Sequence, residues 1–574
     1  MNKDKPADTG WKERALRGYF LLLTLESVVM LAYIASLPAD PKNSWLLGLS
    51  RNRWLMLAAA LAMSATSLFP LVKSWVGGGW LQRQALRLEA WLTHNFVLGL
   101  VIIISFLCIV AATWFNSYWM QYSSDEFLQA YIIRLAPFVI WLCLVAIETL
   151  LLLPFLRKAL APAYLALLVS VLCAVVIDML TNTPEFKQMP WDTRYYYLLA
   201  ERGLDSHDLI APYNYRYLNP LLAHTLAGLF NISTYMALKT IAYFGAISQL
   251  FTIYLLMRYL GFRLRASLVA MLVTAFSMWN LKFLMFDSFR PDHLAYALMA
   301  LAVLALLSRH PLWCLALSAI GLQTREYLAI PPLILALFSL NEWWQNRAHK
   351  KPLLLATFSV LVTSLAVILP RLLIPATEST QFVDPSNNPA TIVNLIDMPL
   401  NLGRDFNLLF TVTAYFLPLL LLATPARLKS VWARLGRPLA KAPEMRVFLV
   451  IYTGMVFLLT LYGGHDLGRY FTYAFITQVI LIQYLLKEDI RVEEMIYMFG
   501  VIVIFNRLWL PIPIWDFEKY LDFYGGYAER VNLITLMRVL ELAVYIVGAL
   551  SLRAILRKKY GHSSIQPRGL EPPS

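Results

Sequence analysis

The sequence predicts an all-α protein, a polytopic transmembrane helical bundle of about sixteen helices, and three observations favour this fold. Of the 574 residues, 59% are hydrophobic and 15% are charged, whereas soluble globular domains contain about 25% charged residues. Apolar runs of about membrane-spanning length recur throughout the chain. The 49 lysines and arginines exceed the 35 acids and gather in alternate connections between the runs. Together these features exclude a soluble globular protein.

The apolar runs give the elements of the predicted bundle in chain order. They are residues 18–37, 54–76, 95–117, 131–155, 159–181, 235–257, 264–282, 291–308, 312–324, 327–344, 353–370, 406–424, 446–463, 468–486, 495–513 and 534–552. The run at 312–324 is short and ends before Arg325-Glu326, so it and its neighbour could be re-entrant, which would lower the number of spans by two. An even number of spans is expected in both cases.

The connections divide the predicted bundle into three parts. Residues 1–158 are expected to form accessory transmembrane helices, and residues 159–533 the core. Residues 534–574 supply the last transmembrane helix and a basic cytoplasmic tail. Three connections are expected on the outer face, residues 182–234, 371–405 and 514–533.

The basic residues orient the bundle in the membrane. Placing both termini in the cytoplasm puts the most basic connections inside, which is the distribution that the positive-inside rule predicts. These connections contain Arg258, Arg263, Arg265, Arg347, Lys350, Lys351, the cluster at 427–446, Arg553, Arg557, Lys558 and Lys559. The net charge of +14 is therefore interpreted as a consequence of membrane topology.

Several function classes lack their sequence signatures. No Gly-x-x-x-x-Gly-Lys or Gly-x-Gly-x-x-Gly loop is present, so ATP-driven transport and the use of a sugar nucleotide are not supported. No basic patch interleaved with aromatic residues occurs on one polar domain, which argues against a nucleic-acid partner. The four cysteines lie inside apolar runs, where a thiol behaves as a small hydrophobe.

The first outer loop is the longest polar interruption of the core and contains a candidate catalytic carboxylate. Its segment from Trp191 to Ala200 follows Pro190 and has the composition of a helix that lies at the membrane interface. Asp192 stands at the start of this segment, where it could act as a general base toward an incoming hydroxyl or amine. The other interpretation is an N-cap aspartate that accepts hydrogen bonds from free backbone amides.

Three short patterns in this loop resemble the first outer loop of the GT-C superfamily, multi-pass glycosyltransferases that use polyprenyl-phosphate-linked sugars. They are Asp192-Thr193-Arg194-Tyr195, Ala211-Pro212-Tyr213 and Arg216-Tyr217-Leu218-Asn219-Pro220-Leu221-Leu222. In that family an acidic residue of the first large outer loop is the catalytic base, so the resemblance implies this role for Asp192. Many members carry two consecutive acids where this chain has Asp192-Thr193, and a Lys-Pro-Pro-Leu segment where it has Asn219-Pro220-Leu221.

The resemblance covers residues 160–520 and implies a GT-C-like core with extra N-terminal helices. It implies a polyprenyl-phosphate sugar as donor, a cell-envelope glycan, lipid or protein as acceptor, and a location in the lipid bilayer of a bacterial inner (plasma) membrane. Arg194, Tyr195 and Arg216 belong to the matching patterns and are expected to bind substrate.

Two further polar groups interrupt the outer ends of predicted helices. The first contains Lys282, Asp287, Arg290 and Asp292, and the second is Arg325-Glu326. Side chains of the first group could be snorkelling or salt-bridged, or they could contact substrate. Asp287 and Asp292 are the candidate ligands for a divalent cation, the one cofactor considered. Arg325-Glu326 would be costly in hydrocarbon, so the pair is expected to neutralise itself or face a cavity.

The last polar group is Gly463-Gly464-His465-Asp466-Leu467-Gly468-Arg469-Tyr470. Its glycines allow close backbone approach, and Arg469 enters the following helix at the outer interface. The planar guanidinium suits a phosphate oxygen, and related glycosyltransferases show similar pairs at such a helix start. This resemblance implies that Arg469 contacts the lipid phosphate, with His465 as a further substrate-binding candidate. The other interpretation is an interfacial arginine paired with Asp466.

The sequence therefore favours an enzyme that transfers a hexosyl or pentosyl group from a polyprenyl-phosphate carrier to an acceptor on the extracytoplasmic face. Asp192 would activate the acceptor, and Arg469, Lys282, Arg290 or Arg325 would stabilise the leaving phosphate. Two other classes are a transporter or flippase of lipid-linked saccharides, which should show matched repeats or broken helices, and a non-catalytic membrane assembly protein.

Overall fold

A computed structural model divides the chain into two compact units, Met1–Leu180 and Thr181–Ser574. Most of the residues that the structure describes follow residue 161. The described residues are 162–179, 192–204, 210–211, 213–374, 378–379, 402–436, 444–462, 467–488, 490–506, 508 and 517–560, with six isolated residues between 24 and 61. Almost all of the predicted accessory helices of residues 1–158 lie outside these ranges. The division between the units follows α6 (Pro162–Met179), whereas the sequence placed its boundary before that helix.

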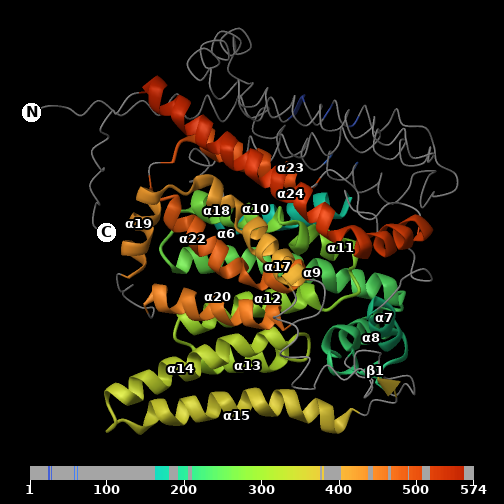
Figure 1. Cartoon of the computed structure of the whole chain (residues 1–574). Coiled ribbons are helices and arrows are strands. Elements are labelled where there is room, and N and C mark those ends of the chain that lie inside the picture. Colours follow the sequence, from blue (N-terminus) through green and yellow to red (C-terminus); the bar gives the residue numbers. More distant parts are fainter. Residues whose placement is uncertain are drawn as a thin grey trace, which may run out of the picture. The chain divides into compact units, whose positions relative to one another are not determined.

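The second unit is helical, and its regular structure in the described ranges includes only two short strands (Figure 1). Its first half contains α7 (Asp192–Arg202), β1 (Ile210–Ala211), η3 (Tyr213–Tyr215), α8 (Leu218–Phe230), α9 (Thr234–Tyr259), α10 (Leu264–Ala275), the π-helix η4 (Met278–Lys282), α11 (Phe283–Phe286), α12 (Asp292–Leu307), α13 (Pro311–Gly321), η5 (Glu326–Ala329), α14 (Ile330–Gln345) and α15 (Lys350–Leu373). Its second half contains β2 (Glu378–Ser379), α17 (Leu402–Tyr415), α18 (Leu417–Leu422), α19 (Pro425–Leu435), α20 (Met445–Leu461), α21 (Leu467–Phe471), η8 (Thr472–Ala474), α22 (Phe475–Leu485), α23 (Val492–Phe505) and α24 (Phe517–Tyr560).

The predicted all-α class is thus confirmed for the described residues. Three of their helices are long and apolar enough to cross a membrane: α9, α15 and residues 535–556 of α24. Shorter apolar helices, including α12 and α20, match further predicted runs in position. The length and composition of these helices therefore indicate membrane association, and the total of about sixteen spans stays a prediction.

Besides α7, the helices α8 and α19 lie inside predicted connections, and each has a local signal at its boundary. α8 occupies part of the first outer loop and ends at Asn231, whose φ of 49° is left-handed, and the Ser233 side chain then caps α9. α19 lies in the predicted cytoplasmic connection, where Thr424 caps it and Pro425 occupies its first turn.

The third predicted outer loop, residues 514–533, is wrong over most of its length. α24 already begins at Phe517 and continues without interruption to Tyr560. The segment is polar enough to be mistaken for a loop, but it contains no proline after Pro513 that would end a helix. The last predicted span is therefore the second part of one long helix.

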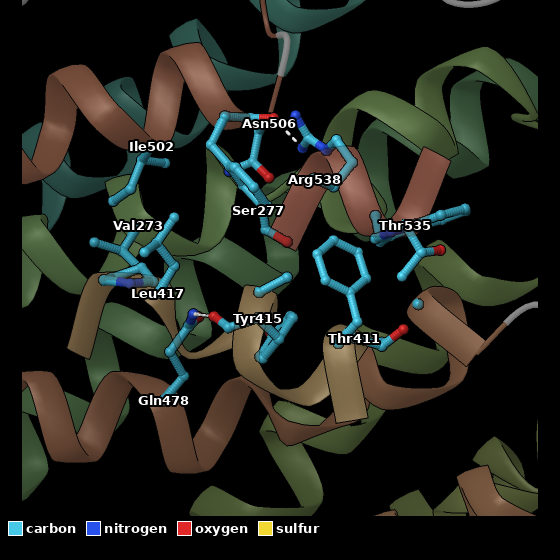
Figure 2. Close-up of a pocket in the computed structure, with 16 residues that line it drawn as sticks. Val273, Ser277, Thr411, Tyr415, Leu417, Gln478, Ile502, Asn506, Thr535 and Arg538 are labelled. Carbon is cyan, nitrogen blue, oxygen red and sulfur yellow. Dashed lines mark hydrogen bonds between the residues drawn. The ribbon is translucent and has the colours of Figure 1, made fainter. Parts of the chain in front are cut away.

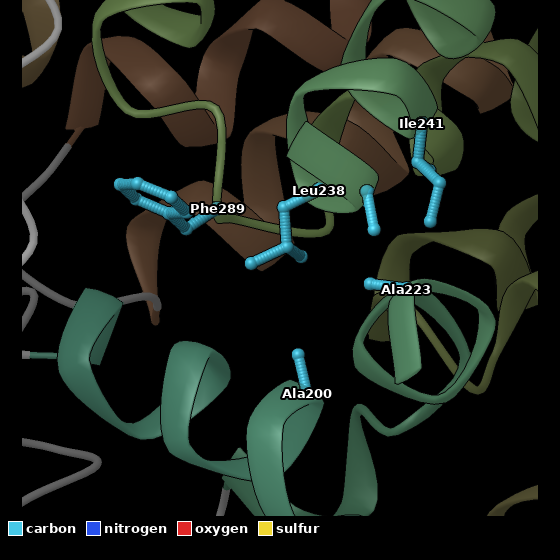
Figure 3. Packing of buried hydrophobic residues seen from close by; sticks show 6 residues of the cluster. Ala200, Ala223, Leu238, Ile241 and Phe289 are labelled. Carbon is cyan, nitrogen blue, oxygen red and sulfur yellow. The ribbon is translucent and has the colours of Figure 1, made fainter. Parts of the chain in front are cut away.

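The centre of the second unit is the packing of α9 against α12. A Cβ placed on Gly245 of α9 would stand 2.7 Å from the carbonyl carbon of His293, so only glycine permits this close approach. Figure 3 shows how the first outer loop packs beside this pair: Ala200 of α7 and Ala223 of α8 meet Leu238 and Ile241 of α9. The small alanine side chains let α7 and α8 lie close to α9.

Connections that were predicted to share a side of the membrane also lie together in the structure. β1 of the first outer loop pairs in parallel with β2 of the second, with Ile210 opposite Glu378. The backbone N–H of Leu218 donates to the carbonyl of Gln323 over 3.2 Å, which attaches the first loop to the turn before η5. At the other end, Glu494 of α23 accepts a hydrogen bond from Arg553 of α24 at 3.0 Å.

Candidate functional site

Polar side chains of the first outer loop, of the turn before α12 and of the turn before η5 form one connected network. At its first point, the Thr193 hydroxyl donates to Oδ2 of Asp287 over 2.8 Å. The same carboxylate oxygen accepts from Nε of Arg290, and Asp287 and Arg290 are both buried. Because Thr193 is the second residue of α7, this bond fixes the start of that helix against the α12 turn.

Arg216 joins the first loop to η5. Its Nε and Nη2 donate to Oε1 of Glu326 at 3.1 and 3.0 Å, and its Nη1 donates to the Tyr196 hydroxyl at 3.1 Å. The Glu326 side chain is 47% exposed. Partial desolvation would raise the pKa of the Glu326 carboxyl, but Arg216 and Arg325 outweigh it and hold this pKa at about 2. Glu326 is therefore a carboxylate, and a weak base, at neutral pH.

The centre of the network is a buried ion pair between η5 and α12. Nη2 of Arg325 lies 2.6 Å from Oδ2 of Asp292, and both side chains are 1% exposed. Burial would lower the pKa of the Arg325 guanidinium, but Asp292 and nearby tyrosines raise it well above its ordinary value. Among the described residues, Nε and Nη1 of Arg325 and Oδ1 of Asp292 have no hydrogen-bond partner. Two nitrogens of a charged guanidinium are thus left without a partner in a buried position.

Arg469 lies on the other side of an aromatic group that borders Arg325. Its Nη2 donates to the Tyr470 hydroxyl at 3.3 Å, and its backbone carbonyl accepts from the Tyr296 hydroxyl at 3.0 Å. The Tyr327 ring stacks on the rings of Tyr470 and Tyr473, with centroids 6.2 and 4.2 Å away. Tyr470 and Tyr473 are both close enough to Arg325 to interact with it electrostatically. The structure therefore brings Asp287, Arg325 and Arg469 into one region.

The remaining predicted site residues have different positions. Arg194 is exposed on α7, whereas Tyr195 is half-buried and stacks on Tyr213 with ring centroids 4.8 Å apart. Lys282 is buried, and its Nζ donates to the carbonyl of Leu508 at 2.6 Å. Asp192 is the first residue of α7, but its side chain lies outside the described residues, as does the whole of His465.

The two aspartates proposed as metal ligands are already engaged. Asp287 binds Arg290 and Thr193, and Asp292 binds Arg325. Within the described part of the chain, no three His, Cys, Asp or Glu side chains are grouped so that they could hold a metal ion. Each of these two carboxylates has a guanidinium partner, and the divalent cation stays a prediction.

A cavity of about 380 Å³ lies next to α21, beside Gly468 (Figure 2). Its walls come from α10, α17, α18, α22, α23 and α24, and they are mostly apolar, as at Val273, Leu417 and Ile502. Figure 2 also shows Arg538 at the edge of the cavity, where its Nη2 donates to the carbonyl of Phe505 at 2.5 Å. An apolar cavity thus adjoins the residue before Arg469.

Sequence reasoning missed four members of the network: Thr193, Tyr196, Tyr327 and Tyr473. In the sequence, Thr193 belongs to the Asp192 pattern and Tyr196 to the segment expected at the membrane interface, whereas Tyr327 and Tyr473 belong to no pattern. Their hydroxyls and rings acquire a role only through partners that are distant in the sequence, such as Asp287, which is 94 residues from Thr193. The adjacency of Thr193 to Asp192 is the one local signal that could have identified any of them.

No family model, no curated protein and no solved structure matches this chain.

Proposed function

We propose that the protein is a glycosyltransferase that moves a sugar from a polyprenyl-phosphate carrier to an acceptor at the end of the bundle where the first outer loop lies. The observation that carries this proposal is the Arg325 guanidinium, which is buried and charged and whose Nε and Nη1 have no partner among the described residues. A phosphate oxygen is a strong acceptor for the N–H groups of a charged guanidinium.

Asp292 prepares Arg325 for this role. Its carboxylate accepts a hydrogen bond from Nη2 at 2.6 Å, which restrains the guanidinium, while Nε and Nη1 have no partner among the described residues. Removing an arginine from water is costly, and the ion pair offsets part of that cost. The guanidinium is thus held ready before any anion arrives, so little reorganisation is needed when negative charge develops.

The reaction follows from these positions and from the resemblance of the first loop to GT-C enzymes. The Asp192 carboxylate takes the proton of the acceptor hydroxyl as the acceptor oxygen attacks the anomeric carbon. The bond between that carbon and the phosphate oxygen breaks, and the phosphate leaves with the electron pair, so the configuration at the anomeric carbon is inverted. Arg325 stabilises the added negative charge on the phosphate, and Arg469, whose Nη2 donates to the Tyr470 hydroxyl, is the second candidate for this role.

The other carboxylates of the network support Asp192 as the base by elimination. Asp287 and Asp292 each have a guanidinium partner, and the pKa of Glu326 is about 2. A carboxylate held by an arginine is a weaker proton acceptor than an unpaired one. The hydrogen bond from Thr193 to Asp287 holds the start of α7, and with it Asp192, against the turn before α12.

The cavity beside Gly468 supports a lipid-linked donor. Gly468, the residue before Arg469, lines this mostly apolar cavity, so the first apolar units of a carrier whose phosphate is bound at Arg469 could enter it.

The proposal is tested by replacing Asp192 with Asn. An amide cannot accept the proton, but it caps a helix about as well as an aspartate. Asp192→Asn should leave thermal stability near that of the wild type and lower sugar transfer by roughly two to four orders of magnitude. The measurement is transfer of radiolabel from a panel of polyprenyl-phosphate monosaccharides to envelope material in membranes that contain matched amounts of each protein.

Glu201→Gln is the matched control, since Glu201 lies exposed on the same helix and the change also converts a carboxylate to an amide. We expect its transfer to equal that of the wild type. Asp192→Ala should lose the cap as well, at about 1 kcal/mol of stability. If Asp192→Asn transfers sugar at the wild-type rate, Asp192 is only a cap, and the proposed base is wrong.

A further inference from the structure

Helix α19 lies at the end of the second unit away from the candidate site. It is amphipathic, and the polar side chains of one face bind other residues of the protein. Arg427 donates to both carboxylate oxygens of Glu494 at 2.7 and 2.8 Å, and Ser430 donates to Glu488 at 2.8 Å. Arg434 forms an ion pair with the same Glu488 at 3.1 Å. These contacts, with buried Val431 and Leu435, fix which face of α19 is turned toward the protein.

The opposite face of α19 exposes two large apolar side chains and a cation. Leu428 and Trp432 are one helical turn apart and are 51% and 53% exposed. Lys429 is exposed beside Leu428. Apolar residues on one stripe with basic residues at its edge are the composition of a helix that lies in the plane of a membrane surface.

Arg446 of α20 completes the exposed face of α19. Its guanidinium carbon lies 4.8 Å from the centre of the Trp432 ring, in a cation–π arrangement. Gly436 makes this position possible, because a Cβ there would overlap the Arg446 guanidinium. The nearest carboxylate oxygen, of Glu444, is 3.9 Å from Nε, which is too long for a hydrogen bond. Arg446 is thus held in place on the ring while its charge is only loosely neutralised.

The position of α20 indicates that Arg446 and the exposed face of α19 lie at a membrane surface. The Tyr327 hydroxyl is 3.4 Å from that of Thr460, so the last turn of α20 lies at the η5 end of the bundle. α20 has 17 residues, mostly apolar, and its length of about 25 Å is close to the thickness of the hydrocarbon core. Arg446, at its start, therefore lies near the opposite lipid–water interface.

We infer that Lys429, Trp432 and Arg446 bind an anionic phospholipid in the membrane leaflet at this end of the bundle. The guanidinium of Arg446 and the ammonium of Lys429 contact the phosphate oxygens, and the faces of Trp432 and Leu428 contact the glycerol and the upper acyl chain. An anionic lipid is favoured over a zwitterionic one because the exposed face carries two cations. This site is independent of the proposed catalytic reaction.

The test measures lipid affinity of the full-length protein purified in detergent. The apparent dissociation constant is taken from the rise in Tm on titration with phosphatidylglycerol, phosphatidylcholine or inorganic phosphate. We expect phosphatidylglycerol to stabilise the wild type and the other two to have little effect. The double variant Lys429→Gln with Arg446→Gln should bind phosphatidylglycerol more weakly, by about fivefold for each charge removed. Trp432→Ala should also weaken binding.

The control is Lys350→Gln with Lys351→Gln, which removes two exposed cations from the start of α15 without touching α19. Its affinity for phosphatidylglycerol should equal that of the wild type. An equal loss in both double variants would mean non-specific attraction by basic residues and would overturn the inference. So would equal stabilisation by phosphatidylcholine, or reproduction of the effect by inorganic phosphate alone.

Discussion

The three carboxylates of the network at the candidate site differ in their partners. Asp287 binds Arg290 and Thr193, Asp292 binds Arg325, and Glu326 binds Arg216. Only Glu326 is substantially exposed, at 47%. A buried ion pair resists separation because either charge, if left buried without its partner, would raise the free energy of the folded protein. An exposed ion pair is screened by water and is weaker. The two aspartates are thus expected to be fixed parts of the site, and the Arg216–Glu326 pair a weaker attachment of the first loop.

The contribution of Glu326 to the stability of the protein is expected to depend on pH. Its pKa is about 2 in the folded protein, against an ordinary value of 4.5, so its contribution to stability is complete above pH 4.5. That contribution is lost as the pH falls from 4.5 toward 2, because the folded state must then take up the proton that the unfolded state already holds. Glu326→Gln should therefore lower Tm at pH 6, and the difference from the wild type should shrink below pH 4.5.

The measurement is Tm of both proteins in detergent at a series of pH values. Other acids titrate in the same range, but they do so in both proteins, so the difference isolates Glu326. A difference that stays constant down to pH 2.5 would show that the Arg216–Glu326 ion pair contributes nothing to stability.

At the scale of elements, the contact between η4 and α21 positions Arg469. A Cβ on Gly468 would overlap the indole nitrogen of Trp279, so the two elements touch through a glycine. Trp279 and Gly468 also line the cavity beside α21. The π-helical turn at Met278–Lys282 therefore determines where the cavity wall and the start of α21 meet.

Gly468→Ala should destabilise the protein by about 1–3 kcal/mol, because the indole or the helix must move to accept the added methyl group. We also expect reduced sugar transfer, since the neighbouring Arg469 would be displaced. Gly454→Ala is the matched control: it lies within α20 and a Cβ there meets nothing within 4 Å. That change should be neutral or stabilise the helix by up to about 1 kcal/mol. Equal Tm values for the two alanine variants would contradict the close contact with Trp279.

At the scale of the whole molecule, the second unit has two polar ends joined by apolar helices. One end holds the first outer loop, β2 and η5, and the other holds α19 and the start of α20. The alternation of connections along the chain predicted this arrangement, because each spanning helix carries the chain from one interface to the other. The positive-inside rule adds that the α19 end faces the cytoplasm.

This orientation predicts a pattern of cysteine labelling. In a background without the native cysteines, Glu201→Cys on α7 should react with an impermeant maleimide added to intact cells. Lys350→Cys at the start of α15 should react only after the membrane is opened. Both positions are exposed in the folded protein, so burial does not prevent labelling. Labelling of Lys350→Cys in intact cells, with protection of Glu201→Cys, would invert the orientation and place the candidate site in the cytoplasm.

The sequence by itself determined the helical class, the positions of most apolar helices and which connections share an end. These features depend on local hydrophobicity and on the length needed to cross a bilayer, both of which can be read along the chain. It failed at 517–533, where polar composition indicated a loop and the absence of proline allowed a helix. Local signals such as Thr424 before Pro425 were also too weak to predict α19 without its packing partners.

Only the tertiary structure decided which charges are partners. The sequence placed Arg216, Asp292, Arg325 and Glu326 as separate candidates, and it left Arg325-Glu326 either paired with each other or facing a cavity. In the structure Arg325 pairs with Asp292, 33 residues away, and Glu326 with Arg216, 110 residues away. The physical reason is that adjacent residues at the start of η5 point toward different neighbours, and helix packing alone determines which opposite charge each one meets.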